Sequence, residues 1–254
     1  MRLRRLDING GQVLEEPNWR LILPPTPNGY ANAQIDDYGL DGIGRPDYPW
    51  LPGTRLQLRA RFSHPAGQLI GTAGFGFWNA PFADPNVRWP ALPQAVWFFF
   101  ASTPTDLPLA HAGPGRGWFA STVDATSGSA LAMIPLAPAA LLLNQFDGLR
   151  RRIWPGIQRR LKISYAPVSD RMQDWHHYTI SWMPDGCSFL IDGESVLNTA
   201  YSPKGPLGFV CWVDNQYLIA TNRGRLAWGT LPTMAVQTLE VDGLEVTRQT
   251  LPGD

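Results

Sequence analysis

The stretch WHHYTISWMPDGCSFLIDGESV (residues 175–196) decides the fold class of this chain. It contains two strand-like runs, residues 176–183 and 187–193, with Asp185 and Gly186 between them. An Asp-Gly pair between two such runs is a strong hairpin signal, because both residues tolerate the backbone angles of a tight turn. The stretch therefore predicts an antiparallel β-hairpin in the second half of the chain.

Further strand-like segments lie on both sides of this hairpin. In residues 54–64 leucine and alanine alternate with arginine and glutamine, which predicts a strand with one buried and one polar face. Residues 94–102 are almost wholly apolar, which predicts a strand covered on both faces. The other candidate strands are residues 19–23, 30–36, 71–79, 195–201, 208–214 and 237–248. About ten to thirteen strands in all predict a larger jelly roll rather than an immunoglobulin domain.

One segment, residues 136–163, breaks the β pattern and predicts a short helical insertion. Leu142 and Phe146 belong to a set of apolar residues spaced by three and four, and Pro138 suits the first turn of a helix. Pro155, which is followed by glycine, is expected to end that helix.

The composition indicates a single domain spanning residues 1–254. With 21 basic and 21 acidic side chains, no overall field favours nucleic acid. Cys187 and Cys211 lie far apart without a metal-binding motif, which predicts two buried free thiols. The amino terminus has basic residues but no apolar stretch after them, so we expect no secretory signal and a cytoplasmic protein.

Neither a metal site nor a cofactor site is expected. His176 and His177 are adjacent in a predicted strand, so their side chains point to opposite faces and cannot readily chelate one ion together. An acidic loop without calcium-loop spacing contains Asp36, Asp37, Asp41 and Asp47. The glycines of residues 113–118 lack the lysine and the long helix of a phosphate loop and predict a turn.

Several segments resemble, in order, the strand motifs of one known family. LRARFSHP (58–65) is similar to the pattern FEARIKLP, and GTAGFGFWN (71–79) to GTWPAFWM. WPALPQAVWFFF (89–100) resembles WPxxGEIDIME, TLEVDGLEV (238–246) resembles MxVDYVRVY, and the hairpin segment resembles FHTYAIEWTPDxIxxYVDGxxV. These are motifs of the family-16 glycoside hydrolases, and the resemblance covers about residues 30–250. It implies an all-β, concanavalin-like jelly-roll β-sandwich of two antiparallel sheets.

The catalytic positions of that family are occupied differently here. Retaining glycosidases need two carboxyl groups about 5 Å apart, and the family places carboxylates two residues apart on one strand so that they share a cleft. At the matching positions this chain has Gln94, Val96 and either Phe98 or Phe99. An amide is not a useful nucleophile, and phenylalanine transfers no proton. The family mechanism of hydrolysis is therefore not expected.

If the strands curve as in that family, residues 71–79, 94–102, 116–120 and 207–216 contribute one face of a concave aromatic cleft. Aromatic rings stack on the apolar faces of sugars while amides and carboxylates bind hydroxyls, so the cleft suits a carbohydrate, and it suits an apolar small molecule equally well. The candidate ligand-binding residues are Asn32, Gln34, Arg61, Trp78, Asn79, Gln94, Trp97, Phe98, Trp118, Trp212 and Asp214. Any of these tryptophans can instead belong to the core, to which we assign Trp182.

Three kinds of function remain open from the sequence. The first is a non-hydrolytic protein that binds a glycan or an apolar molecule in the cleft. The second is an enzyme of different chemistry, such as a cyclase, isomerase or lyase, that uses Asp214 and Gln94; a capping role for Asp214 is the plainer alternative. The third is a membrane-surface or protein-partner module in which Arg150, Arg151 and Arg152 act with neighbouring apolar residues; the plainer alternative is a lid with solvated arginines.

Overall fold

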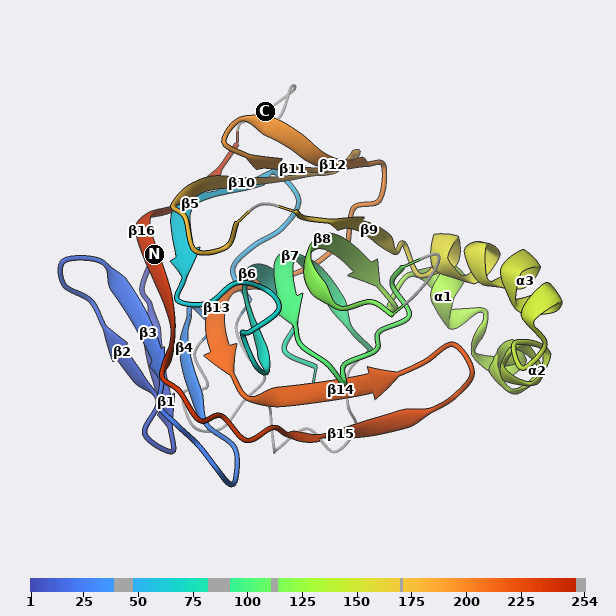
Figure 1. Cartoon of the computed structure of the whole chain (residues 1–254). Coiled ribbons are helices and arrows are strands. Elements are labelled where there is room, and N and C mark those ends of the chain that lie inside the picture. Colours follow the sequence, from blue (N-terminus) through green and yellow to red (C-terminus); the bar gives the residue numbers. More distant parts are fainter. Residues whose placement is uncertain (39–47, 82–91, 111–113, 170, 250–254) are drawn as a thin grey trace, which may run out of the picture.

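The computed structural model describes residues 1–38, 48–81, 92–110, 114–169 and 171–249. Two seven-stranded antiparallel sheets, here called sheet A and sheet B, pack against each other through a shared hydrophobic core. A two-stranded sheet and a group of helices lie beside them (Figure 1). This architecture confirms the predicted all-β jelly-roll sandwich with a helical insertion.

Sheet A has the strand order β1-β4-β13-β6-β7-β8-β9. Its strands are β1 (Arg4–Ile8), β4 (Asn32–Asp36), β6 (Thr72–Trp78), β7 (Gln94–Ala101), β8 (Gly117–Asp124), β9 (Ser164–Pro167) and β13 (Gly208–Asp214). Strands distant in sequence, such as β4 and β13, are neighbours in this sheet, so its surface combines side chains from all parts of the chain.

Sheet B has the strand order β12-β11-β10-β5-β16-β3-β2. Its strands are β2 (Gln12–Leu14), β3 (Trp19–Leu23), β5 (Thr54–Phe62), β10 (His176–Met183), β11 (Gly186–Ile191), β12 (Glu194–Thr199) and β16 (Gln237–Arg248). The small third sheet pairs β14 (Gln216–Ala220) with β15 (Leu226–Thr230).

The predicted hairpin is present as β10 and β11, which pair from Tyr178 opposite Ile191 to Met183 opposite Gly186. The alternation predicted for β5 is also confirmed, because buried and half-buried residues alternate along its whole length. The sequence analysis missed β1, β2, β9, β14 and β15. These strands are three to five residues long, and they form sheet edges or the small third sheet, so they give a weaker signal than the equally short but inner strands β3 and β4.

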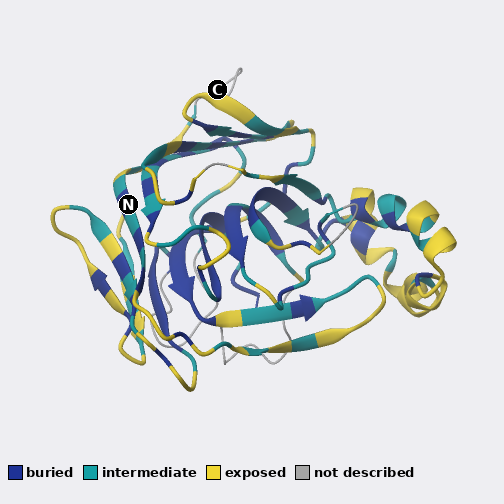
Figure 2. Ribbon diagram, viewed as in Figure 1, coloured by how far each residue is buried: buried dark blue, intermediate teal, exposed yellow. Residues whose placement is uncertain are grey.

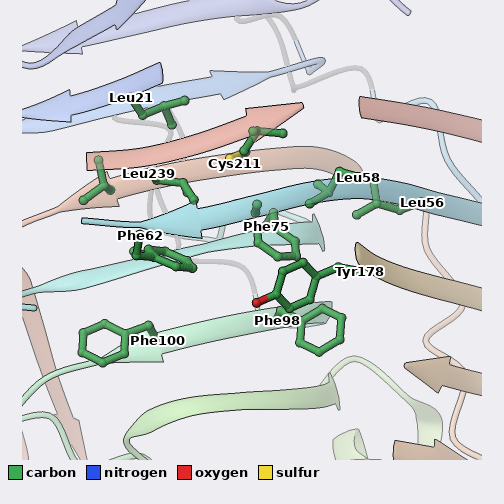
Figure 3. Close-up of a cluster of buried hydrophobic side chains, with 14 of the residues drawn as sticks. Leu21, Leu56, Leu58, Phe62, Phe75, Phe98, Phe100, Tyr178, Cys211 and Leu239 are labelled. Atoms are coloured by element: carbon green, nitrogen blue, oxygen red, sulfur yellow. The ribbon is translucent and has the colours of Figure 1, made fainter. Parts of the chain in front are cut away.

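The core between the sheets is rich in aromatic side chains. Phe75, Phe98 and Tyr178 contact one another with ring centroids 4.9 to 5.7 Å apart. Most buried residues lie on the central strands (Figure 2), and their side chains fill the space between the sheets (Figure 3). Trp182 is fully buried there, as predicted, and Cys211 is likewise a buried free thiol, as is Cys187.

The helical insertion consists of α1 (Gly128–Leu131), the 3-10 helix η1 (Ile134–Leu136), α2 (Ala137–Leu143) and α3 (Asp147–Arg160). Pro138 lies in the first turn of α2, as predicted. The prediction that Pro155 ends a helix is wrong, because α3 continues through it. Burial of Trp154 and Gln158 on either side holds the second half of α3 in place despite the missing backbone donor. No helix in the described segments is long and apolar enough to cross a membrane.

Candidate functional site on the outer face of sheet A

The candidate site is the outer face of sheet A, which is the face turned away from sheet B. Because strand residues alternate between faces, Val96 and Phe98 belong to the core between the sheets, whereas Trp97 and Phe99 belong to a second cluster on the outer side. Strand register places the following residues on the same outer face: Asn32, Gln34, Asp36, Thr72, Gly74, Gly76, Trp78, Phe119, Ser121, Val210, Trp212 and Asp214.

Aromatic rings from neighbouring strands contact one another on this face. Trp78 and Trp212 stack with ring centroids 6.3 Å apart, and Trp97 lies 6.0 Å from Trp78 and 5.8 Å from Trp212. Phe99 lies 4.8 Å from Trp97 and 5.4 Å from Phe119. We call these five residues the aromatic face. Trp78 and Trp97 are half-buried, whereas the other three are buried, so the two half-buried rings form most of its accessible surface.

Two glycines on β6 make room for these rings. A Cβ atom on Gly76 would lie 2.5 Å from the carbonyl oxygen of Val96 and 2.6 Å from the Cα atom of Trp97. A Cβ atom on Gly74 would lie 3.1 Å from the ring of Trp212. Because neither position carries a side chain, Trp97 and Trp212 approach each other across the strand that separates them.

A hydrogen-bonded polar group borders the aromatic face on β1 and β4. Arg4 Nη2 and Gln34 Nε2 both donate to Asp36 Oδ2 at 2.8 Å. Burial raises the pKa of Asp36, while the bonds from Arg4 and Gln34 lower it. Trp78 Nε1 donates to the hydroxyl of Tyr38 at 2.6 Å, which fixes the orientation of the indole. The polar group therefore holds the edge of the aromatic face in position.

Trp212 is held by a second chain of hydrogen bonds. Its Nε1 donates to Thr72 Oγ1 at 2.9 Å, and Thr72 Oγ1 donates to Asp214 Oδ1 at 2.8 Å. The backbone N–H of Gln216 donates to the same carboxylate oxygen at 3.0 Å. Burial raises the pKa of Asp214 from 3.8 to about 6, although these hydrogen bonds lower it. Asp214 thus acts on the ring of Trp212 through Thr72.

Two buried polar atoms on this face have no hydrogen-bond partner among the described residues. They are Trp97 Nε1, a donor within the aromatic face, and Asn32 Oδ1, an acceptor on β4 opposite Asp214. Buried polar atoms are usually paired, so this unpaired donor and acceptor are exceptions on the outer face, and neither atom is exposed to solvent.

The placement of Phe98 and Trp118 on the cleft face is wrong. Both side chains point into the core between the sheets, where Phe98 is fully buried and Trp118 is 3% exposed. The error comes from strand period: Phe98 follows Trp97 directly, so the two residues cannot share a face. The positions that match the family's carboxylates are Gln94, Val96 and Phe98. They alternate with Trp97 and Phe99, so they lie on the side of β7 that faces the core.

Arg61 is also misplaced, because it lies on sheet B and not on sheet A. Its guanidinium bonds to both carboxylate oxygens of Glu240 at 3.1 and 3.2 Å and stands over the ring of Trp175. The alternation of β5 directs this side chain to the outer side of sheet B, away from the aromatic face.

Gln94 and Asn79 lie at the beginning of β7, where their amides make hydrogen bonds within the protein. Gln94 Nε2 donates to Thr126 Oγ1 at 2.6 Å, and its Oε1 accepts from the backbone N–H of Gly205 at 3.1 Å. Asn79 bonds through both side-chain atoms to backbone groups at the start of this strand. Asp214 pairs with Thr72, and Thr72 pairs with Ala101, so Asp214 and Ala101 lie at the same level of the sheet. Gln94 is seven positions from Ala101 on β7, so about 23 Å along the strand direction separates Gln94 from Asp214. They do not form one site.

The outer face carries two described carboxylates, and they are far apart. Asp214 lies opposite Asn32 on β4, and Asp36 is four positions further along that strand, which corresponds to about 13 Å. Glycosidase pairs are about 5 Å apart in retaining enzymes and about 6.5 to 9.5 Å apart in inverting enzymes. The outward-facing residues of β7 itself are Ala95, Trp97, Phe99 and Ala101, which have no carboxyl group.

The described residues contain no group of three histidine, cysteine, aspartate or glutamate side chains that could hold a metal ion. His176 Nδ1 pairs with Asp192 at 2.6 Å, whereas the neighbouring His177 is exposed. Asp41 and Asp47 of the acidic loop lie outside the described residues. Asp37 is bonded to the backbone N–H of Phe209, and burial raises its pKa to about 6.

Comparison with known proteins relates the chain to one family. Residues 153–207, which include β10 and β11, match the sequence profile of Glycosyl hydrolases family 16. None of the curated protein sequences matches the chain. The match includes the segment on which the predicted resemblance chiefly rests, so that resemblance is confirmed.

Solved structures support the same fold. A structure described under "Prominent members of the human gut microbiota express endo-acting O-glycanases to initiate mucin breakdown" has a TM-score of 0.51 and 14% identity, covering 96% of this chain and 85% of that one. A Bacillus licheniformis β-glucanase has a TM-score of 0.50 and 10% identity, covering 98% of this chain and 92% of that one. At such identities the likeness concerns the fold alone.

The sequence analysis missed several residues of this site. Phe99 and Phe119 belong to the aromatic face, and Thr72 positions Trp212. Strict period-two alternation from Trp97 would have found Phe99. No local signal marks Thr72, because its role depends on the pairing of β6 with β13.

Proposed function

We propose that this protein binds a carbohydrate on the aromatic face without hydrolysing it. The observation that carries the proposal is the contact of Trp78, Trp97 and Trp212 on an outer sheet surface. Indole rings offer flat apolar surfaces that stack on the C–H faces of sugar rings, and the rings of Trp78 and Trp97 are only half-buried.

The alternative ligand, an apolar small molecule, has less support. Such ligands usually bind in a hollow that encloses most of their surface. Two hollows formed by described residues, of about 450 and 430 Å³, lie elsewhere. The first is lined by Ala66, Leu69, Ser102, Arg116 and Leu231, and the second lies on sheet B beside Met183. The two half-buried rings of the aromatic face, Trp78 and Trp97, suit stacking against an extended glycan.

The absence of hydrolysis is proposed from the carboxylates. The two on the described outer face are spaced too widely for a glycosidase pair, and β7 directs two alanines, a tryptophan and a phenylalanine outward. The fold is shared with a protein described as a β-glucanase, which is why a glycan is the ligand class to test first. An enzyme of other chemistry that uses Asp214 with Gln94 is not proposed, because the two residues lie at opposite ends of the sheet.

The test is calorimetric titration of the purified protein with soluble β-glucans and galactans, together with an assay for newly formed reducing ends. Binding without new reducing ends is expected. Trp97→Ala and Trp78→Ala should weaken binding by about tenfold or more, since each removes a stacking ring. Trp175→Ala is the matched control, because this tryptophan packs against Arg59 and Arg61 on the other sheet.

Two results would contradict the proposal. Release of reducing ends that persists in the Trp97→Ala protein would point to a hydrolytic site elsewhere. Equal loss of binding in Trp97→Ala and Trp175→Ala would show that the outer face of sheet A is not the binding surface. A thermal-shift screen gives an independent measure, because a ligand at a hundred times its dissociation constant stabilises the fold by about 2.7 kcal/mol.

A further inference from the structure

The helices α1, η1, α2 and α3, here called the helical arm (residues 128–160), extend from the sandwich beyond the β9 edge of sheet A (Figure 1). Much of the arm is exposed (Figure 2). The carbohydrate proposal gives the arm no role. Its exposed surface nevertheless differs in chemistry from the rest of the described protein.

Amide side chains attach the arm to the rest of the protein. Asn144 Nδ2 donates to the carbonyl oxygen of Asn222 at 2.9 Å, and Gln158 Nε2 donates to that of Leu109 at 2.8 Å. Both amides are almost fully buried, with 1% and 2% of their surface exposed. Gln145 Nε2 donates to the carbonyl oxygen of Arg223 at 2.9 Å, next to the first of these contacts. Two of the arm's buried side chains are thus polar, and the other two are Ala130 and Trp154.

The large apolar side chains of α2 and of the segment before α3 are exposed instead, whereas Trp154 of α3 is buried. Leu142 is 66% exposed, Phe146 is 61% exposed, and α2 has no buried residue. A helix on the surface of a soluble protein normally directs its apolar stripe toward the core, and α2 does not do so. The exposed apolar set consists of Leu131, Ile134, Leu136, Leu141, Leu142, Leu143, Phe146 and Leu149. A concentration of exposed apolar side chains in one segment indicates an interaction site.

The arm is also strongly basic. Residues 128–160 contain five arginines but a single acidic residue, Asp147, which gives a net charge of 5 − 1 = +4. The whole chain has a formal net charge of zero, so the remainder carries −4. Ion pairs join Arg150 and Arg223 to Asp147 and Lys162 to Asp124. On α3, Leu149, Arg152 and Arg159 are separated by three and seven residues and therefore share the face opposite Trp154.

We propose that the helical arm binds the surface of a membrane that contains anionic lipids. The exposed leucines and Phe146 enter the interface between headgroups and acyl chains, and Arg151, Arg152, Arg159 and Arg160 contact lipid phosphates. A protruding apolar tip fits a fluid interface, which needs no complementary groove. Positive charge around that tip matches an anionic surface. The arm lies on the membrane and does not span it.

The experiment is co-sedimentation of the full chain with vesicles of phosphatidylcholine alone and of phosphatidylcholine with added phosphatidylglycerol. We expect binding only to the anionic vesicles, with affinity that falls as salt is raised. The variants Leu142→Ser/Phe146→Ser and Arg151→Gln/Arg152→Gln should each lower the partition coefficient by about tenfold or more. Trp228→Ser/Met234→Ser replaces two exposed apolar residues outside the arm, 71% and 81% exposed, and should bind as the parent does.

Several outcomes would overturn the proposal. They are equal binding to both kinds of vesicle, unchanged binding by the arm variants, and no binding to either vesicle. Self-association that is lost in Leu142→Ser/Phe146→Ser, measured by light scattering without vesicles, would instead identify a second copy of this chain as the occupant. Because every substituted residue is exposed, the variants should keep the parent's melting temperature. The same variants should bind glycan as the parent does, so a failure of membrane binding can be told apart from a failure of the carbohydrate proposal.

Discussion

Trp78 and Trp212 stack on the outer face of sheet A with ring centroids 6.3 Å apart and planes inclined by 7°. The two rings come from neighbouring strands, β6 and β13, that are far apart in the sequence. Each indole N–H is already bonded within the protein, Trp78 to Tyr38 and Trp212 to Thr72. The pair is therefore oriented before any ligand arrives, so binding need not restrict freely rotating rings.

Adjacent residues of β7 should respond differently to truncation. Phe98→Ala removes a fully buried ring from the core and should lower the free energy of unfolding by about 3 to 5 kcal/mol. Trp97→Ala removes a half-buried ring from the outer face and should cost less stability while it weakens glycan binding. Urea denaturation of both variants measures the difference. Equal destabilisation by the two changes would contradict the assignment of faces.

The bridging role of Thr72 predicts a loss of stability in Thr72→Val. Valine has nearly the same shape, but it leaves Trp212 Nε1 without its acceptor and removes one donor to Asp214. An unpaired buried polar group costs about 1 to 3 kcal/mol, so the free energy of unfolding should fall by that amount. Near-ultraviolet circular dichroism should also show a less fixed indole. Thr179→Val, on the outward side of β10, is the control, and an effect as large there would refute the bridge.

Asp214 predicts a dependence of stability on pH. Its pKa in the folded protein is raised to about 6 by burial, above its unfolded value of about 3.9, so the fold favours the protonated form. The stability that the protonated Asp214 contributes to the fold is fully present below about pH 4 and is lost as the pH rises through about 6. Asp214→Asn keeps an oxygen acceptor for Thr72 and Gln216 and removes the charge. Relative to the parent, its free energy of unfolding should therefore increase between about pH 4 and 7, by up to about 3 kcal/mol.

Urea denaturation at a series of pH values measures this difference for Asp214→Asn. Burial also raises the pKa values of Asp36 and Asp37, so the parent's own slope contains their contributions, and the comparison with the variant isolates Asp214. Asp7→Asn, at an exposed position of β1, is the control. Stability curves for parent and Asp214→Asn that run parallel from pH 4 to 7 would show that Asp214 is ionised normally in the fold.

The close approach of β7 to Gly76 on β6 predicts that this position tolerates no side chain. In Gly76→Ala the new Cβ would meet backbone atoms at 2.5 and 2.6 Å, so β6 and β7 must move apart or the chain must lose stability. We expect a lower melting temperature and weaker glycan binding. Gly148→Ala in α3 has nothing within 4 Å of its Cβ and should be neutral or slightly stabilising, since alanine favours helices. Similar melting temperatures for both variants would contradict the role assigned to Gly76.

Much of the fold was predictable because its main strands carry local signals. The hairpin signal around Asp185, the alternation of β5 and the apolar run of β7 each act over a few residues, and all three predicted elements are present. The turn itself consists of Pro184 and Asp185, because Gly186 begins β11 opposite Met183. The course of α3 through Pro155 was not predictable, since it depends on burial of Trp154 and Gln158 against other segments. The single-domain organisation and the cytoplasmic location stay predictions.

By itself, the sequence determined the fold class, the hairpin and the helical insertion, because strand periodicity and turn chemistry are properties of short segments. Only the tertiary structure decided which aromatic residues meet. Trp78, Trp97 and Trp212 come together through the pairing of β13 with β6 and of β6 with β7, and Arg61 falls on the opposite sheet. A shift of one residue in strand register moves a side chain from the surface to the core, so strand pairing and register decide which side chains form the site.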